Sequence, residues 1–276
     1  MSAVKHDEVG YWTEVKLDIL KNYAAAYSTI MAKQRSIKRH IYIDAFAGAG
    51  VHISKNTGNY ISGSPLNALL VQPPFSELHF IDMDGGRAEQ LRKMAKRHTN
   101  VHVYEGDCNR ILAEKVFPSC HYESYGRALC LLDPYGLHLN WSVMAAAGAM
   151  KSVEIFLNFP VMDINMNVLR HDRAKVADDQ KARMDAFWGD SSWSQVAYPQ
   201  TEGLFGPLEE KTTNDQLAAA FRERLRSVAG FECVPEPMPM RNTNKAVVYY
   251  LYFASQNHTG ARIVSNIFKK HRNQGL

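Results

Sequence analysis

Short apolar runs alternate with helix-forming stretches along the first 160 residues of the chain. The segment from Trp12 to Met31 carries apolar residues near a 3.6-residue period, which predicts an amphipathic helix. Apolar runs of strand length follow at residues 41–43, 78–81, 101–104, 128–132 and 153–157. Helix-like stretches separate these runs, and this alternation predicts βαβ units that build a mostly parallel sheet.

Local start signals place several of the helices. Ser64 and Pro65 supply an N-cap and a first-turn proline for one helix. A second helix follows the glycines at 85–86, and Asp84 is its expected N-cap. We expect further helices over residues 141–150 and 214–228.

The βα rhythm breaks between Met162 and Thr213, where polar, helix-leaning segments contain no clear strand. We expect an insertion or cap there. Two later strand candidates, at 231–234 and 246–254, flank a proline-rich connection and are expected to pair as an antiparallel edge. The expected fold is therefore α/β, as one domain over residues 1–276 with a helical extension at 1–40 and a helical insertion at 162–213.

Composition restricts the class of protein. The chain has 276 residues with 46% apolar content, enough for a full core. No window approaches the ~18 apolar residues of a membrane span, and the first residues lack a secretory signal pattern. We therefore expect a cytoplasmic protein without a membrane partner. The cysteines and histidines show no metal-ligand spacing, so we predict reduced thiols and no metal.

The mild excess of basic residues permits a polyanionic partner such as nucleic acid but does not require one. Lysine and arginine number 32 against 28 acidic residues, a formal net charge of +4. Basic clusters occur at 33–40, 87–98 and 268–272, although a solvated helix face is the commoner explanation of each.

The sequence YIDAFAGAG, at residues 42–50, ends a predicted strand in Asp44 and continues into small residues. Gly48 and Gly50 stand where a side chain would collide with a nucleotide-like ligand, although glycine turns also serve close packing. The long spacing to the next strand-end acid and the lack of GxGxxG argue against a dinucleotide, and the lack of GK[ST] excludes a P-loop.

Other predicted strands also end in acids. Asp82 closes the second strand, where a carboxylate can accept from both ribose hydroxyls. Asp107 follows the third, where it can accept from an adenine amino group, and Asp133 follows the fourth. Because the carboxyl ends of parallel strands meet at one edge, we expect these groups to converge on one crevice.

These motifs resemble those of class I S-adenosylmethionine-dependent methyltransferases. YIDAFAGAG matches the glycine motif, FID the ribose acid, EGDC with Cys108 the adenine site and LLDPYG the catalytic strand end. More narrowly, the chain resembles the three-Cys-motif partner family, through WTEVKL at 12–17, FAGAG, GSP at 63–65, LDPYG, Asn158-Phe159 and the late VVYYLYFAS. The resemblance implies a Rossmann-like fold, S-adenosylmethionine as cofactor and a protein partner with a three-cysteine motif.

The resemblance also assigns roles to residues. Asp44 and the loop from Gly48 to Gly50 would hold the methionine end of the cofactor, Asp82 its ribose and Asp107 its adenine. The aromatic rings of Phe46 and Tyr135 are candidates to face the sulfonium cation. These assignments follow from the family and not from the spacing of the residues.

The sequence DPYG at 133–136 resembles the DPPY tetrad of enzymes that methylate amino groups of nucleic acids. Asp133 and Tyr135 are the expected catalytic residues, with Asp133 handling the proton of the substrate nitrogen, and Pro134 would contact the substrate. The tyrosine stands one place early, with Gly136 where the tetrad has its aromatic, so Phe159 and Trp141 are further candidates to stack on a base. Asn158 would place an amide at the substrate mouth, and Lys16 and Arg170 are candidates to contact phosphate.

Three candidate functions follow from these motifs. The first is methylation of an amino group on nucleic acid. The second keeps the enzyme but changes the substrate to a peptide or small molecule, with the 162–213 insertion closing the pocket. The third is a cofactor-binding partner protein that performs no transfer.

Overall fold

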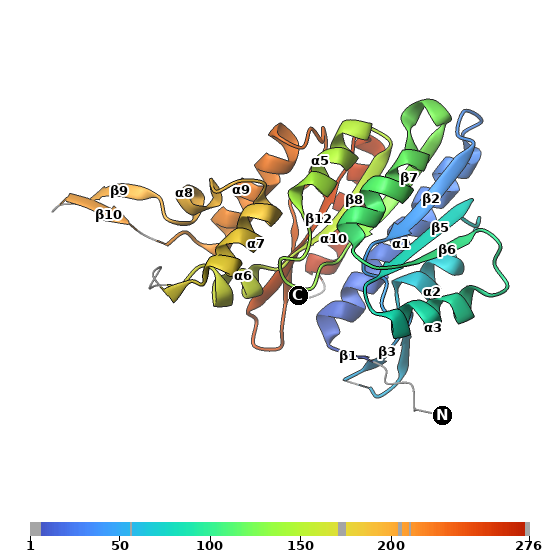
Figure 1. The fold of residues 1–276 in the computed structure, drawn as a ribbon, viewed down its shortest axis with the longest axis horizontal. Helices are drawn as coiled ribbons and strands as arrows, with labels where there is room; N and C mark the ends of the chain where they lie inside the picture. The colour runs from blue at the N-terminus through green and yellow to red at the C-terminus, as the bar shows by residue number, and fades with distance from the viewer. Residues whose placement is uncertain (1–6, 56, 171–174, 204–205, 210, 274–276) are drawn as a thin grey trace.

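The structure is a computed structural model that describes residues 7–55, 57–170, 175–203, 206–209 and 211–273. A seven-stranded sheet forms its centre, in the order β11-β12-β8-β7-β2-β5-β6 (Figure 1). All five apolar runs predicted as strands lie in this sheet. Its strands are β2 (Arg39–Asp44), β5 (Glu77–Asp82), β6 (Val101–Glu105), β7 (Gly126–Leu132), β8 (Val153–Phe159), β11 (Met238–Arg241) and β12 (Val247–Ala254).

The strands β2, β5, β6, β7 and β8 are parallel. The chain builds outward from β2 through β5 to β6, then returns to the other side of β2 and builds outward through β7 to β8. The direction of winding thus reverses between β2 and β7. This is the doubly wound, Rossmann-like α/β arrangement, and the predicted fold class is confirmed.

The C-terminal hairpin extends the sheet with antiparallel pairing, as predicted. β12 pairs antiparallel with β8, and β11 pairs antiparallel with β12 at the edge. The strand predicted at 231–234 is wrong, because Cys233 makes only an isolated bridge to Ser255. The edge strand lies instead in the proline-rich segment, where Met238 and Met240 are buried on one face. Pro239 is tolerated because an edge strand leaves one side of its backbone unpaired.

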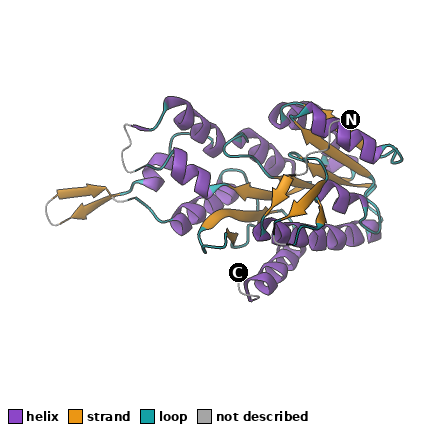
Figure 2. Ribbon diagram, turned by 90° about the horizontal axis from the view of Figure 1, so that it is seen from below, coloured by secondary structure: helices purple, strands orange, loops and turns teal. Residues whose placement is uncertain are grey.

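Helices cover both faces of the sheet (Figures 1 and 2). On one face lie α1 (Tyr11–Lys33), α2 (Ser64–Leu69), α3 (Gly85–Ala95) and α10 (His258–Asn273), and on the other α4 (Cys108–Ile111) and α5 (Trp141–Met150). Alternate strand residues pack against the two layers: Tyr42 faces α1, whereas Ile41 and Ile43 face the opposite layer. α10 was not predicted.

The predicted helix starts are confirmed at α3 and corrected at α2. Asp84 caps α3, since its Oδ1 accepts a hydrogen bond from the Arg87 amide at 2.8 Å. At α2 the N-cap is Gly63, and Ser64 is already helical. Glycine is required there because Gly63 donates to the Gly50 carbonyl at 2.8 Å and an added Cβ would lie 2.9 Å from that oxygen.

A small second sheet, which the sequence pattern did not predict, separates the glycine loop from α2. It consists of β1 (Asp7–Val9), β3 (Val51–Ser54) and β4 (Tyr60–Ser62), in the order β1-β3-β4. β1 runs parallel to β3, and β4 returns antiparallel. The loop after β2 therefore leads into a hairpin before the chain enters α2.

The region after β8 is largely helical, as predicted, and also contains a strand pair that was not. It comprises α6 (Val161–Asn167), α7 (Asp178–Trp188), α8 (Trp193–Ala197), the antiparallel pair β9 (Gln200–Gly203) and β10 (Gly206–Glu209), and α9 (Asn214–Ser227). The pair projects from the body of the molecule (Figure 1). No helix among the described residues is both long and apolar enough to cross a membrane.

Candidate functional site

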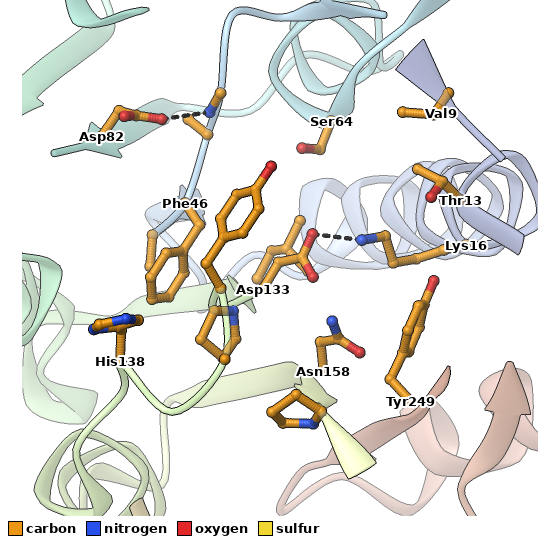
Figure 3. A pocket seen from close by; sticks show the side chains of 18 of the residues that line it. Val9, Thr13, Lys16, Phe46, Ser64, Asp82, Asp133, His138, Asn158 and Tyr249 are labelled. Carbon is orange, nitrogen blue, oxygen red and sulfur yellow. Dashed lines mark hydrogen bonds and ion pairs between the residues drawn. The ribbon is translucent and has the colours of Figure 1, made fainter. Parts of the chain in front are cut away.

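A cleft of about 820 Å³ opens at the carboxyl ends of the parallel strands. Residues that follow β2, β5, β6, β7 and β8 all line it, so it lies where the direction of winding reverses. Open α/β sheets bind ligands at this place, and the volume lies within the range of small-molecule sites. Helix α1 forms one wall through Trp12, Thr13 and Lys16. Figure 3 shows Thr13 and Lys16 on this wall.

The glycine loop forms part of the cleft lining. Gly48 has a φ of +66°, and a Cβ added there would meet no atom within 4 Å, so its backbone faces open space. Phe46 and Gly48, which the sequence suggests as cofactor contacts, line the cleft. Gly50 is not among the lining residues; a Cβ there would approach the Met94 sulfur at 3.1 Å, so this glycine serves close packing.

Asp82 anchors the glycine loop to β5. Its Oδ2 accepts from the Gly48 amide at 2.8 Å, and its Oδ1 accepts from the Asp84 amide at 2.8 Å. The residue is 7% exposed and lines the cleft. Each carboxylate oxygen has a second lone pair, so Asp82 can still accept from a ligand.

Asp107 and Cys108 line the cleft beyond β6. Asp107 caps α4, and its Oδ1 accepts from the Asn109 amide at 3.0 Å. Its carboxylate is exposed and keeps lone pairs for a ligand. Burial raises the pKa of the Cys108 thiol to about 12, so this group stays protonated near neutral pH.

Asp44 lies beneath the cleft and not in its lining. It is fully buried, and its Oδ1 accepts from the Phe46 amide at 3.3 Å. Burial raises its pKa to about 7, and the Asp133 carboxylate adds to this, whereas the Ser64 hydroxyl and the Lys16 ammonium act in the opposite direction. Asp44 therefore shapes the turn into the loop, and the structure does not bring it into the cleft.

The Lys16 ammonium and the Asp133 carboxylate form an ion pair on the cleft floor (Figure 3). Burial would lower the pKa of Lys16, but the neighbouring carboxylate more than compensates, and the net effect is a raised pKa. The ammonium also lies 5.5 Å from the centre of the Tyr249 ring. Lys16 is thus a buried cation tied to a predicted catalytic residue and not an exposed phosphate contact.

The segment after Asp133 shapes the cleft mouth. Pro134 is buried and lines the cleft, whereas Tyr135 is 72% exposed. Gly136 has a φ of +56°, and an added Cβ would lie 3.0 Å from Asp163 Oδ2. An aromatic residue at position 136 would therefore be strained.

Asn158 and Phe159 end β8 but face different environments. Asn158 is 9% exposed and lines the cleft, and its Oδ1 has no hydrogen-bond partner among the described residues. Phe159 is fully buried, with its ring 4.7 Å from that of Phe221, and is absent from the lining. The structure therefore places Phe159 in the core and not at the substrate mouth.

Sequence reasoning missed several lining residues. Ser64, Met83, Asp163 and Tyr249 all line the cleft, as does much of α1. The position of Met83 could have been inferred from the sequence, because it directly follows the strand-end acid Asp82. The position of Tyr249 could not, because it is set by the pairing of β12 with β8, which are far apart in the sequence. Arg170 is not in the lining, and Trp141 is buried in the core. Among the described residues, no cluster of three or more His, Cys, Asp or Glu could hold a metal ion.

Comparisons with known proteins give a fold but no family. No family model matches the chain, and no curated protein does. Protein LPL1258 from Legionella pneumophila has a TM-score of 0.52 at 12% identity, over 95% of this chain and 91% of that one. At this identity the likeness shows the fold alone.

Two further structures are methyltransferases by their descriptions. The methyltransferase domain of bacterial CtHen1 has a TM-score of 0.42 at 10% identity, over 87% of this chain and 98% of that one. An S-adenosylmethionine-dependent methyltransferase from Mesorhizobium loti has a TM-score of 0.36 at 11% identity, over 85% and 99%. Likenesses this distant carry no argument about the activity of this chain.

Proposed function

We propose that the protein binds S-adenosylmethionine in the cleft and transfers its methyl group to an amino group of a nucleic acid. One observation carries this proposal: Asp82, Asp107 and Asp133, from the ends of three strands, line the same cleft with the open backbone of Gly48. The bound cofactor would supply an electrophilic methyl group on a sulfonium.

The cleft residues fit the polar groups of this cofactor. Asp82 retains lone pairs for the ribose hydroxyls, and Asp107 retains them for the adenine amino group. Cys108 and the exposed Met83 offer apolar contact beside them. At Gly48 the backbone can approach a ligand closely because no side chain projects from it.

Asp133 is the residue placed to orient the substrate nitrogen. Its Oδ2 is held by Lys16, which leaves Oδ1 to accept an N–H bond from an amino group. Holding that nitrogen in line with the methyl group is the main contribution that such a reaction needs. The ion pair keeps the carboxylate fixed while it does so.

The mouth of the cleft supports nucleic acid as the substrate class. Tyr135, Met83 and Met166 are large apolar side chains that are 72%, 72% and 59% exposed around it. An exposed aromatic ring can stack on an unpaired base, which contributes roughly 1 to 3 kcal/mol. Lys55 and Arg87 also line the cleft and can face phosphate.

Labelled cofactor tests the proposal directly. The protein is incubated with methyl-labelled S-adenosylmethionine and bulk tRNA, rRNA, DNA or lysate protein, beside an Asp133→Asn variant. We expect label in nucleic acid with the wild type and a loss of at least about 100-fold with the variant. Label only in protein or small molecules would end the nucleic-acid proposal and favour the peptide or metabolite alternative.

A second candidate is a cofactor-binding partner protein without transfer activity. In this second function the ion pair between Lys16 and Asp133 has a structural role only. In this second function the protein would act together with a partner that carries a three-cysteine motif, and this partner stays a prediction. If S-adenosylmethionine binds and Asp133→Asn leaves every phenotype unchanged, this second function is preferred.

A further inference from the structure

The edge of the sheet opposite the cleft is poor in acidic residues. β2, β5, β6, β7 and β8 are parallel, so the segments that lead into them all lie at this edge. These segments comprise residues 34–38, 70–76, 96–100, 121–125 and 151–152. The one carboxylate in them is that of Glu123, whereas the strand-end acids lie at the cleft edge. The described part of the molecule therefore separates acidic from basic groups along its strands.

Basic side chains occupy the acid-poor edge. We call this edge the amino-end surface and define its cations as Lys33, Arg35, Lys38, Lys96, Arg97, Arg127 and Lys151. Arg127 is half-buried and the others are exposed. Among the residues that the structure describes, the neighbouring Arg39 pairs with Glu77 at 2.9 Å, whereas no salt bridge involves the cations of this surface. Their charge is thus available to a partner.

Helix dipoles explain only some of these cations. Lys33 lies in the last turn of α1, and Lys96 and Lys151 are the C-caps of α3 and α5. Basic residues are favoured at such positions because helix C-termini carry partial negative charge. Lys38 and Arg127 lie beyond the helices, so their presence requires another reason.

Two exposed tyrosines stand among the cations. Tyr122 and Tyr125 are 51% and 49% exposed. The Arg127 guanidinium lies 3.7 Å from the centre of the Tyr122 ring, and the Lys38 ammonium lies 5.0 Å from the centre of the Tyr125 ring. The Lys38 amide also donates to the Tyr125 carbonyl at 3.0 Å, which joins the segments before β2 and β7. Rings and cations therefore form one continuous surface.

This combination suits single-stranded nucleic acid. Cations follow the phosphates of such a chain, and exposed aromatic rings stack on its unpaired bases. Neighbouring strands lie about 4.8 Å apart, so the edge from β8 to β6 is about 20 Å long. A stacked nucleic-acid strand rises about 3.4 Å per nucleotide, and the edge can therefore contact about six nucleotides.

We infer that the amino-end surface binds a single-stranded segment of nucleic acid, at a site separate from the cleft. β2 has six residues and is about 20 Å long, so a nucleotide bound at this surface is not the nucleotide at the cleft. The inference goes beyond the proposed function, because binding at this surface requires no methyl transfer. Where transfer does occur, the surface would hold a distant part of the same chain.

Two other anionic partners match the surface less well. A membrane would require apolar side chains that insert, and Leu70 is the one exposed large aliphatic residue in the described segments at this edge. An acidic peptide would pair with the cations but would make no use of the rings of Tyr122 and Tyr125. Nucleic acid accounts for both the charge and the rings.

Charge variants test the surface by fluorescence anisotropy with a labelled single strand of about 12 nucleotides. Arg35→Gln with Lys96→Gln removes two charges from the surface, and Lys269→Gln with Lys270→Gln removes two exposed charges from α10. At about 0.1 M salt, we expect the first pair to weaken binding at least about 5-fold and the second less than about 2-fold. The first pair should also reduce the slope of log K against log salt concentration by about 1.4.

A ring variant separates nucleic acid from other anions. Tyr122→Leu keeps the charge of the surface and removes an aromatic ring, and Tyr60→Leu on β4 is the matched control. We expect Tyr122→Leu to weaken binding of the oligonucleotide at least about 5-fold and to leave binding of an oligoglutamate unchanged. Tyr60→Leu should change neither. All variants should bind S-adenosylhomocysteine as the wild type does, which shows that they are folded.

Wild-type protein gives a test that needs no variant. An oligonucleotide that carries 5-iodouracil is cross-linked by light, and we expect cross-links in the peptide that contains Tyr122 and Tyr125. Cross-links confined to cleft residues would overturn the inference. Equal losses from the two charge pairs, no loss from Tyr122→Leu, or tighter binding to oligoglutamate or to phosphatidylserine vesicles would also overturn it.

Failure of this inference is distinguishable from failure of the proposed function. Methyl transfer to nucleic acid that is insensitive to the surface variants would overturn the inference and leave the proposed function in place. Binding at the surface by a protein that transfers no methyl group would support the inference and overturn the proposed function.

Discussion

Lys16 and Asp133 are separated by 117 positions in the sequence and meet as an ion pair on the cleft floor. Helix α1 supplies the ammonium, and the carboxyl end of β7 supplies the carboxylate. Their side chains are 8% and 26% exposed, so the lysine has far less access to water than its partner. The N-terminal helix is therefore part of the cleft.

This asymmetry predicts unequal costs for the two halves of the pair. Asp133→Ala leaves a buried ammonium without compensation and should lower the free energy of unfolding by about 3 kcal/mol. Lys16→Met should cost less, because methionine fills similar space and Asp133 can be hydrated. Urea unfolding at pH 7 measures both, with Lys21→Met on the exposed side of α1 as control. A larger loss from Lys16→Met than from Asp133→Ala would contradict this account of the pair.

Gly48 and Gly58 form a matched pair for testing the loop. Their φ angles are +66° and +69°, and a Cβ added at either would meet no atom within 4 Å. Replacing either glycine with alanine should therefore lower the free energy of unfolding by a similar amount, roughly 1 to 2 kcal/mol, because alanine is disfavoured in the left-handed backbone conformation. Only Gly48 lines the cleft, so only Gly48→Ala should also weaken S-adenosylhomocysteine binding in calorimetry. Equal affinities for the two variants would place the ligand elsewhere.

Glu154 should make stability depend on pH. It is buried, accepts hydrogen bonds from the Tyr23 and Ser255 hydroxyls, and has its pKa raised by burial from 4.5 to about 7. The folded state therefore favours the protonated form, and the associated stability is full below pH 4.5 and lost as the pH rises through 7.

Glu154→Gln removes this dependence because an amide does not titrate in that range. Between pH 4.5 and 8, the free energy of unfolding of the wild type should fall relative to the variant, by up to about 3 kcal/mol. Chemical unfolding at several pH values measures the difference. A difference that is constant with pH, or that grows in favour of the wild type, would show that Glu154 is ionised in the folded protein.

Tyr135 and Tyr60 are both 72% exposed, but only Tyr135 lines the cleft. If Tyr135 stacks on a base, Tyr135→Ala should lower kcat/KM on nucleic acid by roughly 1 to 3 kcal/mol in transition-state terms, whereas Tyr135→Phe should retain most of it. Tyr60→Ala should have no effect. Comparable losses from Tyr135→Ala and Tyr60→Ala would remove the stacking role.

The sequence predicted the parts of the molecule that repeat a simple pattern. The five parallel strands contain short apolar runs. β2, β5, β7 and β8 are buried along almost their whole length, so no polar alternation obscures the signal. The edge strand β6 is only partly buried, with His102 and Glu105 exposed.

The sequence also predicted that the strand-end acids Asp82, Asp107 and Asp133 lie close together, because the carboxyl ends of parallel strands meet at one edge of a sheet. Asp44 also stands at the carboxyl end of a parallel strand, but it is fully buried and accepts a hydrogen bond from the Phe46 amide in the turn that follows. A strand-end acid can therefore serve its own turn and not the cleft.

Other features depend on contacts that a single sequence does not display. The Lys16–Asp133 pair requires α1 to pack on one face of the sheet with its first turns beside the carboxyl ends of the strands, and nothing local to Lys16 indicates this. The sequence suggested that Phe159 lies at the mouth of the cleft because it follows Asn158. Successive side chains along β8 point to opposite faces of the sheet, so Phe159 points into the core. The edge strand β11 contains Pro239, so its composition resembled a loop. The sequence of α10 does have a helical pattern, with Val264 and Phe268 buried four residues apart.

The central claim is that the carboxylates at this sheet edge hold an adenosyl ligand, and calorimetric titration of S-adenosylhomocysteine tests it most directly. Wild-type protein should bind, and Asp82→Ala should weaken binding by roughly 1 to 3 kcal/mol, because the ribose hydroxyls and the Gly48 amide lose their partner. Glu89→Ala, on the exposed face of α3, should bind as the wild type does. An unchanged dissociation constant for Asp82→Ala, or no binding by the wild type, would contradict the account.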